Sequence, residues 1–210
     1  MPSNVELLNI DCMEYMKGLP DKSFDLIITD PPYGINFVSN YRNIKHKKIF
    51  GDNMFPLWIF EEFERIARNG AYVFCRWDNL MEIPKPKSVI AWVKNNWSMG
   101  DLKHEHGRQW EAIAFYPYHD HKFIKRIQDV INIKRTGNNL HPTEKPPCVI
   151  KILLEENEGK SVLDPFLGSG STAIAAYDTR FDFVGCEIDK DYYDVAVKRF
   201  ENHKKQLQLF

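Results

Sequence analysis

The sequence predicts an α/β fold in which helices cover both faces of a mostly parallel sheet. Short apolar runs at 5–10 and 24–29 end in polar residues, as buried parallel strands do, and a third run lies at 71–75. Helix-sized segments alternate with such runs, which is typical of βαβ connections. With 210 residues and 43% hydrophobic side chains the chain can bury one core, so a single domain over 1–210 is expected.

The first half of the chain predicts one βαβ unit. A helix is expected to begin at Pro56 and to stop at Gly70, since the apolar residues between them recur with the spacing of one helix face. This helix lies between the strands at 24–29 and 71–75. The remaining elements are expected in this order: a helix including 89–93, a strand at 112–116, a mostly loop segment at 117–140, a helix at about 145–156, a strand at 162–163, a helix after Gly170, a strand at 183–186 and a final helix from Asp189.

Composition excludes several classes of protein. The balance of 28 Lys and Arg against 29 Asp and Glu leaves a net charge of −1 and no overall positive field. The four cysteines lie far apart with no CxxC pair, so neither a zinc ribbon nor a disulfide framework is expected. His104/His106 and His119/His121 lie in polar loops, where such spacing is a weak metal signal, so no metal is expected. A signal region is absent, and no apolar run approaches the roughly 18 residues of a membrane span, which predicts a cytoplasmic protein.

Positive charge is nevertheless concentrated in two loops. Residues 41–48 include Arg42, Lys45, Lys47 and Lys48 and no acid. Residues 117–140 carry five basic side chains against two acidic ones. Loops at about 34–56 and 117–140 are therefore expected to contact nucleic acid phosphates, with a solvated loop that has no partner as the alternative. The candidates in the second loop are Lys122, Lys125, Arg126 and Arg135.

A glycine-containing turn between a strand and a helix forms the first motif, Asp164-Pro165-Phe166-Leu167-Gly168-Ser169-Gly170-Ser171-Thr172. Its glycines let the backbone turn tightly and let a ligand approach the helix N-terminus, whose free N–H groups attract an anion. Glu187 ends the next strand, near the interval of about 20 residues at which an acidic side chain bonds a ribose. A plain strand-to-helix turn is the alternative.

The second motif, Asp30-Pro31-Pro32-Tyr33, directly follows the strand at 24–29. An exocyclic amine of a nucleobase is a poor nucleophile, because its lone pair is delocalised into the ring. The carboxylate of Asp30 and the carbonyl oxygen of Pro31 can accept its two protons and direct the lone pair outward. Tyr33 can stack on the base, which is worth about 1 to 3 kcal/mol. A structural turn with a packed tyrosine is the alternative.

These two motifs and a third, His141-Pro142-Thr143-Glu144-Lys145-Pro146, resemble the DNA amino-methyltransferases that use S-adenosylmethionine to methylate adenine N6 or cytosine N4. Because the catalytic motif precedes the cofactor motif, the order resembles that of the permuted beta group, which more commonly has glutamine where this chain has Glu144. The resemblance implies a Rossmann-like, seven-stranded methyltransferase sheet, mostly parallel with one antiparallel strand at 112–116, and a circularly permuted motif order.

The resemblance also implies the roles of individual residues. Asp30, Pro31, Pro32 and Tyr33 correspond to the catalytic residues, and Trp110 borders the implied target pocket. Asp11 corresponds to the contact with the cofactor adenine, Glu187 to the ribose ligand, and Thr143 and Lys145 to the contacts with the cofactor carboxylate. The full set of implied cofactor-binding residues is Asp11, Cys12, Asp30, Thr143, Lys145, Asp164, Phe166, Gly168, Ser169, Gly170, Thr172 and Glu187.

The sequence therefore predicts an enzyme that flips an adenine out of duplex DNA and methylates its N6 atom. Asp30 favours adenine, because family members acting on cytosine more often carry serine at that position. The alternatives are cytosine-N4 methylation of DNA, N-methylation of RNA or of a protein amide, and a catalytically silent binding module. A homodimer is expected by analogy with the family alone.

Overall fold

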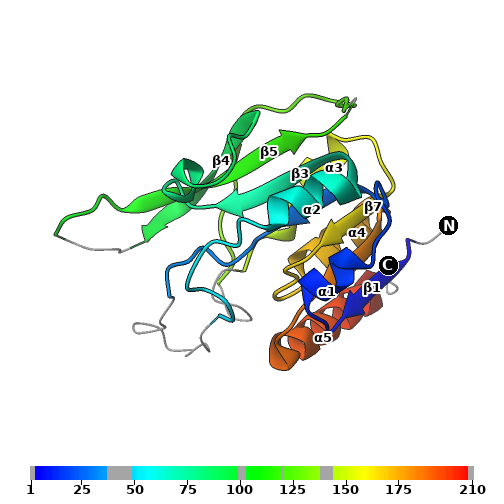
Figure 1. The fold of residues 1–210 in the computed structure, drawn as a ribbon. Coiled ribbons are helices and arrows are strands. Elements are labelled where there is room, and N and C mark those ends of the chain that lie inside the picture. The colour runs from blue at the N-terminus through cyan, green and yellow to red at the C-terminus, as the bar shows by residue number, and fades with distance from the viewer. Residues whose placement is uncertain (1–2, 37–48, 99–102, 120, 138–143, 208–210) are drawn as a thin grey trace.

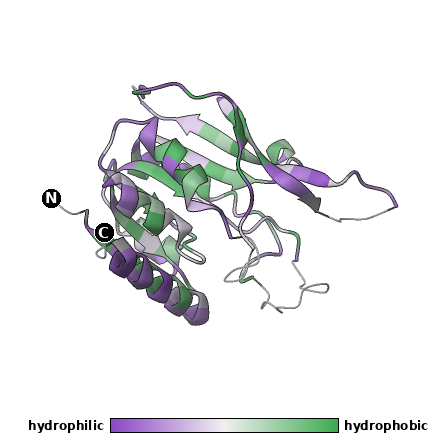
Figure 2. Ribbon diagram, turned by 180° about the vertical axis from the view of Figure 1, so that it is seen from behind, coloured by the Kyte–Doolittle hydropathy of each residue, from purple (hydrophilic) through white to green (hydrophobic). Residues whose placement is uncertain are grey.

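The computed structural model describes residues 3–36, 49–98, 103–119, 121–137 and 144–207. These residues form three layers, in which one twisted sheet lies between two groups of helices (Figure 1). Hydrophobic residues are concentrated along the central strands, whereas the long C-terminal helix is mostly hydrophilic (Figure 2). The apolar core is thus divided by the sheet into two clusters, one on each face.

Eight described strands make up the sheet, in the order β1-β8-β7-β2-β3-β5-β4-β6. β5 runs antiparallel to its neighbours β3 and β4, and the other pairings between described strands are parallel. The bounds are β1 (Val5–Leu8), β2 (Phe24–Thr29), β3 (Ala67–Cys75), β4 (Ser88–Ser98), β5 (Arg108–Pro117), β6 (Val130–Asn132), β7 (Ser161–Asp164) and β8 (Asp182–Cys186).

Helices cover the two faces unequally. α1 and α2 pack on one apolar cluster, and α3, α4 and α5 pack on the other. Among the described residues, no helix is both long and apolar enough to cross a membrane. The bounds are α1 (Cys12–Lys17), α2 (Ile59–Ile66), the short 3₁₀ turn η1 (Asn79–Met81), α3 (Pro147–Glu155), α4 (Ser171–Thr179) and α5 (Lys190–Leu207).

The predicted α/β class and the antiparallel strand at 112–116 are confirmed, since that strand is the centre of β5. The expected number of seven strands is corrected to eight. The segment at 117–140, expected to be mostly loop, contains the short edge strand β6, which pairs with β4. A strand of three residues, of which only Ile131 is buried, carries too little periodic signal to be recognised.

The helix expected around 89–93 is wrong, because these residues belong to β4. Ile90 and Trp92 are buried in the cluster beside α3, while Val89 packs against the opposite cluster. A strand covered on both faces reads as a continuous apolar run, which periodicity does not distinguish from a buried helix. The β-branched side chains of Val89, Ile90 and Val93 favour the strand.

The sequence predicted that Gly70 ends a helix, and this prediction is wrong. α2 ends at Ile66, β3 begins at Ala67, and Gly70 lies inside that strand. A Cβ atom at Gly70 would lie 2.6 Å from the carbonyl oxygen of Tyr116 on β5. Glycine is therefore required here by the close approach of two backbones.

The parallel strands define one edge of the sheet, called here the site edge, at which β2, β3, β4, β7 and β8 end. β5 runs the other way and ends at the opposite edge. The β4–β5 hairpin extends beyond its neighbours at the site edge (Figure 1). Open α/β sheets bind ligands beyond the carboxyl ends of their parallel strands, so the site edge is where a site is expected.

Candidate active site

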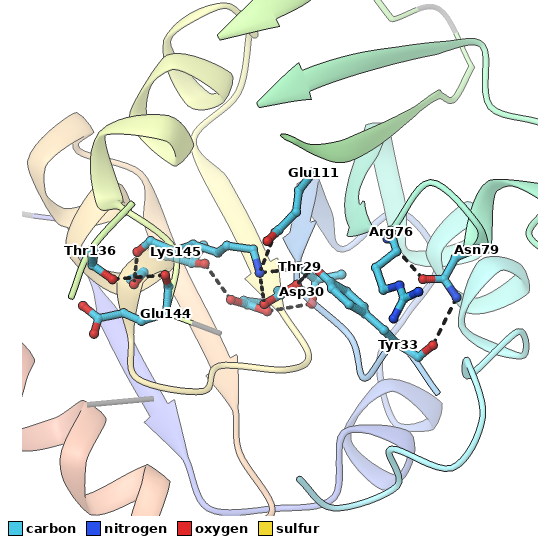
Figure 3. A network of polar contacts seen from close by, with 12 residues as sticks. Thr29, Asp30, Tyr33, Arg76, Asn79, Glu111, Thr136, Glu144 and Lys145 are labelled. Carbon is cyan, nitrogen blue, oxygen red and sulfur yellow. Dashed lines mark hydrogen bonds and ion pairs between the residues drawn. The ribbon is translucent and has the colours of Figure 1, made fainter. Parts of the chain in front are cut away.

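The turn after β2 places a carboxylate at the site edge. Asp30 directly follows Thr29, the last residue of β2, and the Tyr33 hydroxyl donates a hydrogen bond of 2.5 Å to Asp30 Oδ1 (Figure 3). The side-chain amide of Asn79, from η1, donates to the carbonyl oxygen of Tyr33 over 3.1 Å. With two prolines between Asp30 and Tyr33, the turn has few remaining degrees of freedom.

Lys145 reaches the same carboxylate from the segment before α3. Its ammonium nitrogen lies 2.5 Å from Asp30 Oδ2, 3.1 Å from the Tyr33 hydroxyl and 3.3 Å from Glu111 Oε2 (Figure 3). The Lys145 side chain is 5% exposed. The resemblance assigned Lys145 to the cofactor, whereas here its ammonium faces Asp30, and its contact with a cofactor stays a prediction.

These buried charges shift one another's pKa values. Burial raises the pKa of Asp30, and the nearby Lys145 ammonium opposes that rise. Burial acting alone would lower the pKa of Lys145, but the carboxylates of Asp30 and Glu111 outweigh it and raise that pKa. For Glu111, burial favours a higher pKa, and the cations Lys145 and Lys94 reverse this and lower it. Lys145 and Glu111 are therefore charged at neutral pH.

The glycine turn is organised from behind by Asp164, the last residue of β7. Its carboxylate accepts hydrogen bonds from Thr29 Oγ1 at 2.7 Å, from Thr172 Oγ1 at 2.6 Å and from the Phe166 N–H at 3.1 Å. Burial raises the pKa of Asp164 to about 6. The bonds to β2, the turn and α4 fix the turn relative to the strand that carries Asp30.

Glu187 holds the glycine turn from the next strand. Its two carboxylate oxygens accept hydrogen bonds of 2.9 Å from the N–H groups of Gly168 and Asp189. Burial raises the pKa of Glu187 to about 7. Gly168, with φ of 53°, and Gly170, with φ of 80°, have the left-handed backbone that favours glycine.

Both turns line one cavity of about 480 Å³. Its wall includes the turn from Asp30 to Tyr33, which is the predicted catalytic turn, the glycine turn at Phe166 and Gly168, and Glu187. Asp11 and Cys12 line it as well, and Asp11 also caps α1 by accepting a 2.7 Å hydrogen bond from the Met13 N–H. An apolar wall completes the cavity, formed by Ile35, Phe50, Met54, Phe55, Leu57, Trp58 and Ile188.

Other predicted cofactor residues lie deeper in the molecule. A second, much smaller cavity of about 40 Å³ is lined by Lys145, Asp164, Ser169 and Thr172, together with Asp30. Gly170 lines neither of these two cavities, and a Cβ atom there would lie 3.2 Å from the Cβ of Ala196 on α5. Thr143 lies outside the described residues.

The chain matches the family model described as DNA methylase, of the N6/N4 methyltransferase type, over residues 24–198. The chain belongs to this family. The match runs from β2 into α5 and so includes both turns of the cavity.

Known relatives extend the same comparison. The chain is 28% identical to YubD of Escherichia coli strain K12, with 94% of this chain and 91% of YubD covered. It is 24% identical to the DNA adenine methyltransferase YhdJ of the same strain, with 93% and 82% covered. The crystal structure of the M1.HpyAVI–SAM complex superposes with a TM-score of 0.70 at 23% identity, covering 93% of this chain and 99% of that one. This DNA methylase thus shares its fold with the HpyAVI structure.

The described residues among the predicted DNA contacts of this DNA methylase lie at two opposite edges of the sheet. Arg135 lies at the site edge, beyond the end of β6 and beside Asn96 of β4. With the Asn96 amide turned so that its oxygen faces the guanidinium, Arg135 Nη2 lies 3.2 Å from that oxygen. The chain leaves β5 at the opposite edge, and Lys125 and its neighbours follow there, next to Glu156 at the end of α3. Lys122, Lys125 and Arg126 are thus exposed but not brought to the cavity, while Arg42, Lys45, Lys47 and Lys48 lie outside the described residues.

Four residues that hold the two turns were not predicted as site residues. Glu111 contacts Lys145, and Asn79 holds the carbonyl of Tyr33. Asp52 accepts from the Gly34 N–H over 2.9 Å, and Arg199 of α5 donates to Ser169. Each lies at least 18 positions in sequence from the residue that it contacts.

Proposed function

We propose that this DNA methylase transfers a methyl group from S-adenosylmethionine to N6 of an adenine flipped out of duplex DNA. The observation that carries the proposal is that the Asp30–Tyr33 turn and the glycine turn line the same cavity. A nucleobase amine and a methyl donor must meet within bonding distance, and a shared cavity satisfies this requirement.

The residues around the glycine turn fit S-adenosylmethionine. Glu187 and Asp11 offer carboxylate oxygens along the wall, Gly168 leaves the backbone open, and Phe166 and Ile188 form an apolar surface suited to an adenine ring. When bound, the cofactor supplies an electrophilic methyl group on a sulfonium. The HpyAVI relative is a complex with SAM, which supports this choice of cofactor.

Asp30 and the carbonyl oxygen of Pro31 are the groups that orient the amine. Among the described residues, none donates a hydrogen bond to the Pro31 carbonyl oxygen, so this acceptor is available to a substrate. Asp30 keeps unused lone pairs beside its bonds to Tyr33 and Lys145. As the nitrogen–methyl bond forms, the amine loses a proton, and Asp30 is the carboxylate placed to receive it.

Adenine is the favoured target. Asp30 is a carboxylate where cytosine-N4 enzymes of the family more often have serine, and the relative YhdJ is a DNA adenine methyltransferase. The aromatic ring of Tyr33 supplies the stacking surface for the flipped base, and Arg135 at the site edge, with the basic residues at 41–48, supplies contacts to the phosphates.

Incubation with methyl-labelled S-adenosylmethionine and duplex DNA, followed by digestion to nucleosides, tests the proposal. We expect the label in N6-methyladenine. Label in N4-methylcytosine would overturn the choice of base, and transfer to RNA in preference to duplex DNA would overturn the choice of substrate. Mapping of the methylated sites in the same DNA then yields the recognition sequence.

A further inference from the structure

A row of four alternating charges leads from the β4–β5 hairpin to the catalytic turn. Lys94 of β4 pairs with Glu111 Oε1 on β5, Glu111 Oε2 lies 3.3 Å from Lys145 Nζ, and Lys145 Nζ lies 2.5 Å from Asp30 Oδ2. The four side chains are 14%, 21%, 5% and 19% exposed in that order. Two cations and two anions therefore share a mostly dry site, and their charges sum to zero.

Glu111 is the anion of this row that does not line the main cavity. Asp30 lines that cavity, whereas Glu111 lies behind it, against Lys145 and Lys94. Without its charge, Lys145 and Lys94 would leave one uncompensated positive charge beside Asp30. Charges interact strongly where water is excluded, so such an imbalance is felt across the cavity.

The proposed reaction is sensitive to this imbalance. As the nitrogen–carbon bond forms and the carbon–sulfur bond breaks, positive charge passes from the sulfur to the amine nitrogen, which then releases a proton. A net positive site disfavours positive charge at the sulfur and at the amine nitrogen. It also stabilises the Asp30 carboxylate and so makes Asp30 a weaker proton acceptor.

We propose that Glu111 is a positioning residue that holds Lys145 against Asp30 and keeps the site free of net positive charge. This inference rests on the proposed function and deepens it. It explains why an acidic side chain of the antiparallel strand lies behind the catalytic turn, with each of its oxygens facing one lysine. Arg135, which follows β6, lies beside Asn96 of β4 and is half-buried.

The test compares two ligands that differ in one charge. S-adenosylmethionine carries a sulfonium and S-adenosylhomocysteine a neutral sulfur, so calorimetric Kd values for both report the field of the site without turnover. In Glu111→Gln, which keeps the shape, the Kd for S-adenosylmethionine is expected to rise about tenfold more than the Kd for S-adenosylhomocysteine. A merely structural role for Glu111 would weaken both ligands equally, and this result would overturn the inference.

Charge rescue separates electrostatics from packing. Lys94→Met/Glu111→Gln restores the zero sum and is expected to return the ratio of the two Kd values to within about threefold of wild type. Lys94→Met alone removes a cation and is expected to shift the ratio the opposite way, which keeps the inference testable if Glu111→Gln does not fold. A ratio unchanged in Lys94→Met would also overturn it.

Glu105→Gln is the matched control. It removes an equal charge from the same hairpin, at an exposed ion pair with Arg108, and should leave both Kd values unchanged. If the wild-type protein bound neither ligand, the proposed cofactor would be wrong and the inference would fall with it. If the wild type bound both and only the ratio failed to respond, the proposed function would stand and the role of Glu111 would be refuted.

Discussion

Arg199 Nη2 lies 2.9 Å from Glu144 Oε1, which ties the last helix of the chain to the segment that carries Lys145. The same guanidinium donates from Nη1 to the carbonyl oxygen and the hydroxyl of Ser169, each at 3.0 Å, and to the Ser171 hydroxyl at 3.1 Å. One side chain of α5 therefore fixes the glycine turn and the pre-α3 segment relative to each other. Glu144 gives this arginine a charged partner.

Loss of Arg199 is expected to loosen the cofactor site. Arg199→Met removes three hydrogen bonds to the glycine turn and leaves a buried carboxylate unpaired, so we expect a loss of about 1 to 3 kcal/mol in the free energy of unfolding. The Kd for S-adenosylmethionine should rise by about fivefold or more. Chemical denaturation and calorimetry measure the two effects.

Glu144→Gln provides the partner variant. The amide still accepts a hydrogen bond from Arg199, so stability and cofactor affinity should change little. In Glu144→Gln/Arg199→Met the unpaired charge is gone, and part of the stability lost in Arg199→Met should return. Strictly additive effects of the two substitutions would show that the two side chains do not act as a pair.

The stability of the protein without cofactor should depend on the ionisation of Glu187. Burial raises the pKa of this carboxyl from 4.5 to about 7 in the folded state, so the folded protein retains its proton over a range in which the unfolded chain has lost it. The free energy of unfolding should therefore fall as the pH rises through this range.

Glu187→Gln removes this contribution. Relative to wild type, the variant should gain stability on going from pH 4.5 to pH 7, by an amount of the order of 2 kcal/mol. Urea denaturation of both proteins at several pH values measures the difference between their free energies of unfolding. Asp164 contributes equally to both proteins, so its own pH dependence cancels in this difference. A difference that is independent of pH would contradict the raised pKa.

Close contact between β3 and β5 predicts a strong effect at Gly70. Its Cβ position lies 2.6 Å from the Tyr116 carbonyl oxygen, a backbone atom, so Gly70→Ala should cost about 1 to 3 kcal/mol of folding stability. Gly18→Ala is the control, since the added methyl meets Tyr15 O at an ordinary 3.5 Å. Thermal denaturation should show a clear decrease in Tm for the first variant and little change for the second.

The two edges of the sheet predict different roles for Arg135 and Lys125. Arg135→Ala should weaken binding to duplex DNA and reduce the slope of log Kd against log salt by about one. Lys125→Ala removes a basic side chain at the opposite edge and should leave both quantities unchanged. Equal losses in the two variants, in salt titrations monitored by fluorescence anisotropy, would show that the DNA also reaches the opposite edge.

Much of the fold follows from local sequence signals. The strand at 24–29 matches β2, and the helices after Gly170 and from Asp189 match α4 and α5. These elements flank motifs with strong turn residues, so their ends are marked by Pro, Gly or Asp. The strand at 88–98 could not be distinguished from a buried helix by its sequence. A strand that is covered on both faces lacks the alternation of apolar and polar residues that marks a half-exposed strand.

The residues of the candidate site also fall into two groups, those that the sequence predicted and those that it could not. Asp30, Tyr33, Gly168 and Glu187 belong to motifs whose residue types indicate their chemistry, and the structure brings them to one cavity. Glu111 and Arg199 act through contacts with residues more than twenty positions away, which depend on strand order and helix packing. Periodicity and motif spacing carry no information about such contacts.

Replacement of Asp30 separates methyl transfer from cofactor binding. Asp30→Asn keeps the shape of the side chain but removes the carboxylate that is proposed to orient the amine. It should bind the neutral S-adenosylhomocysteine within about threefold of wild type, while methyl transfer to duplex DNA in single-turnover assays at saturating S-adenosylmethionine falls by about a thousandfold. Transfer at the wild-type rate by Asp30→Asn would contradict the account.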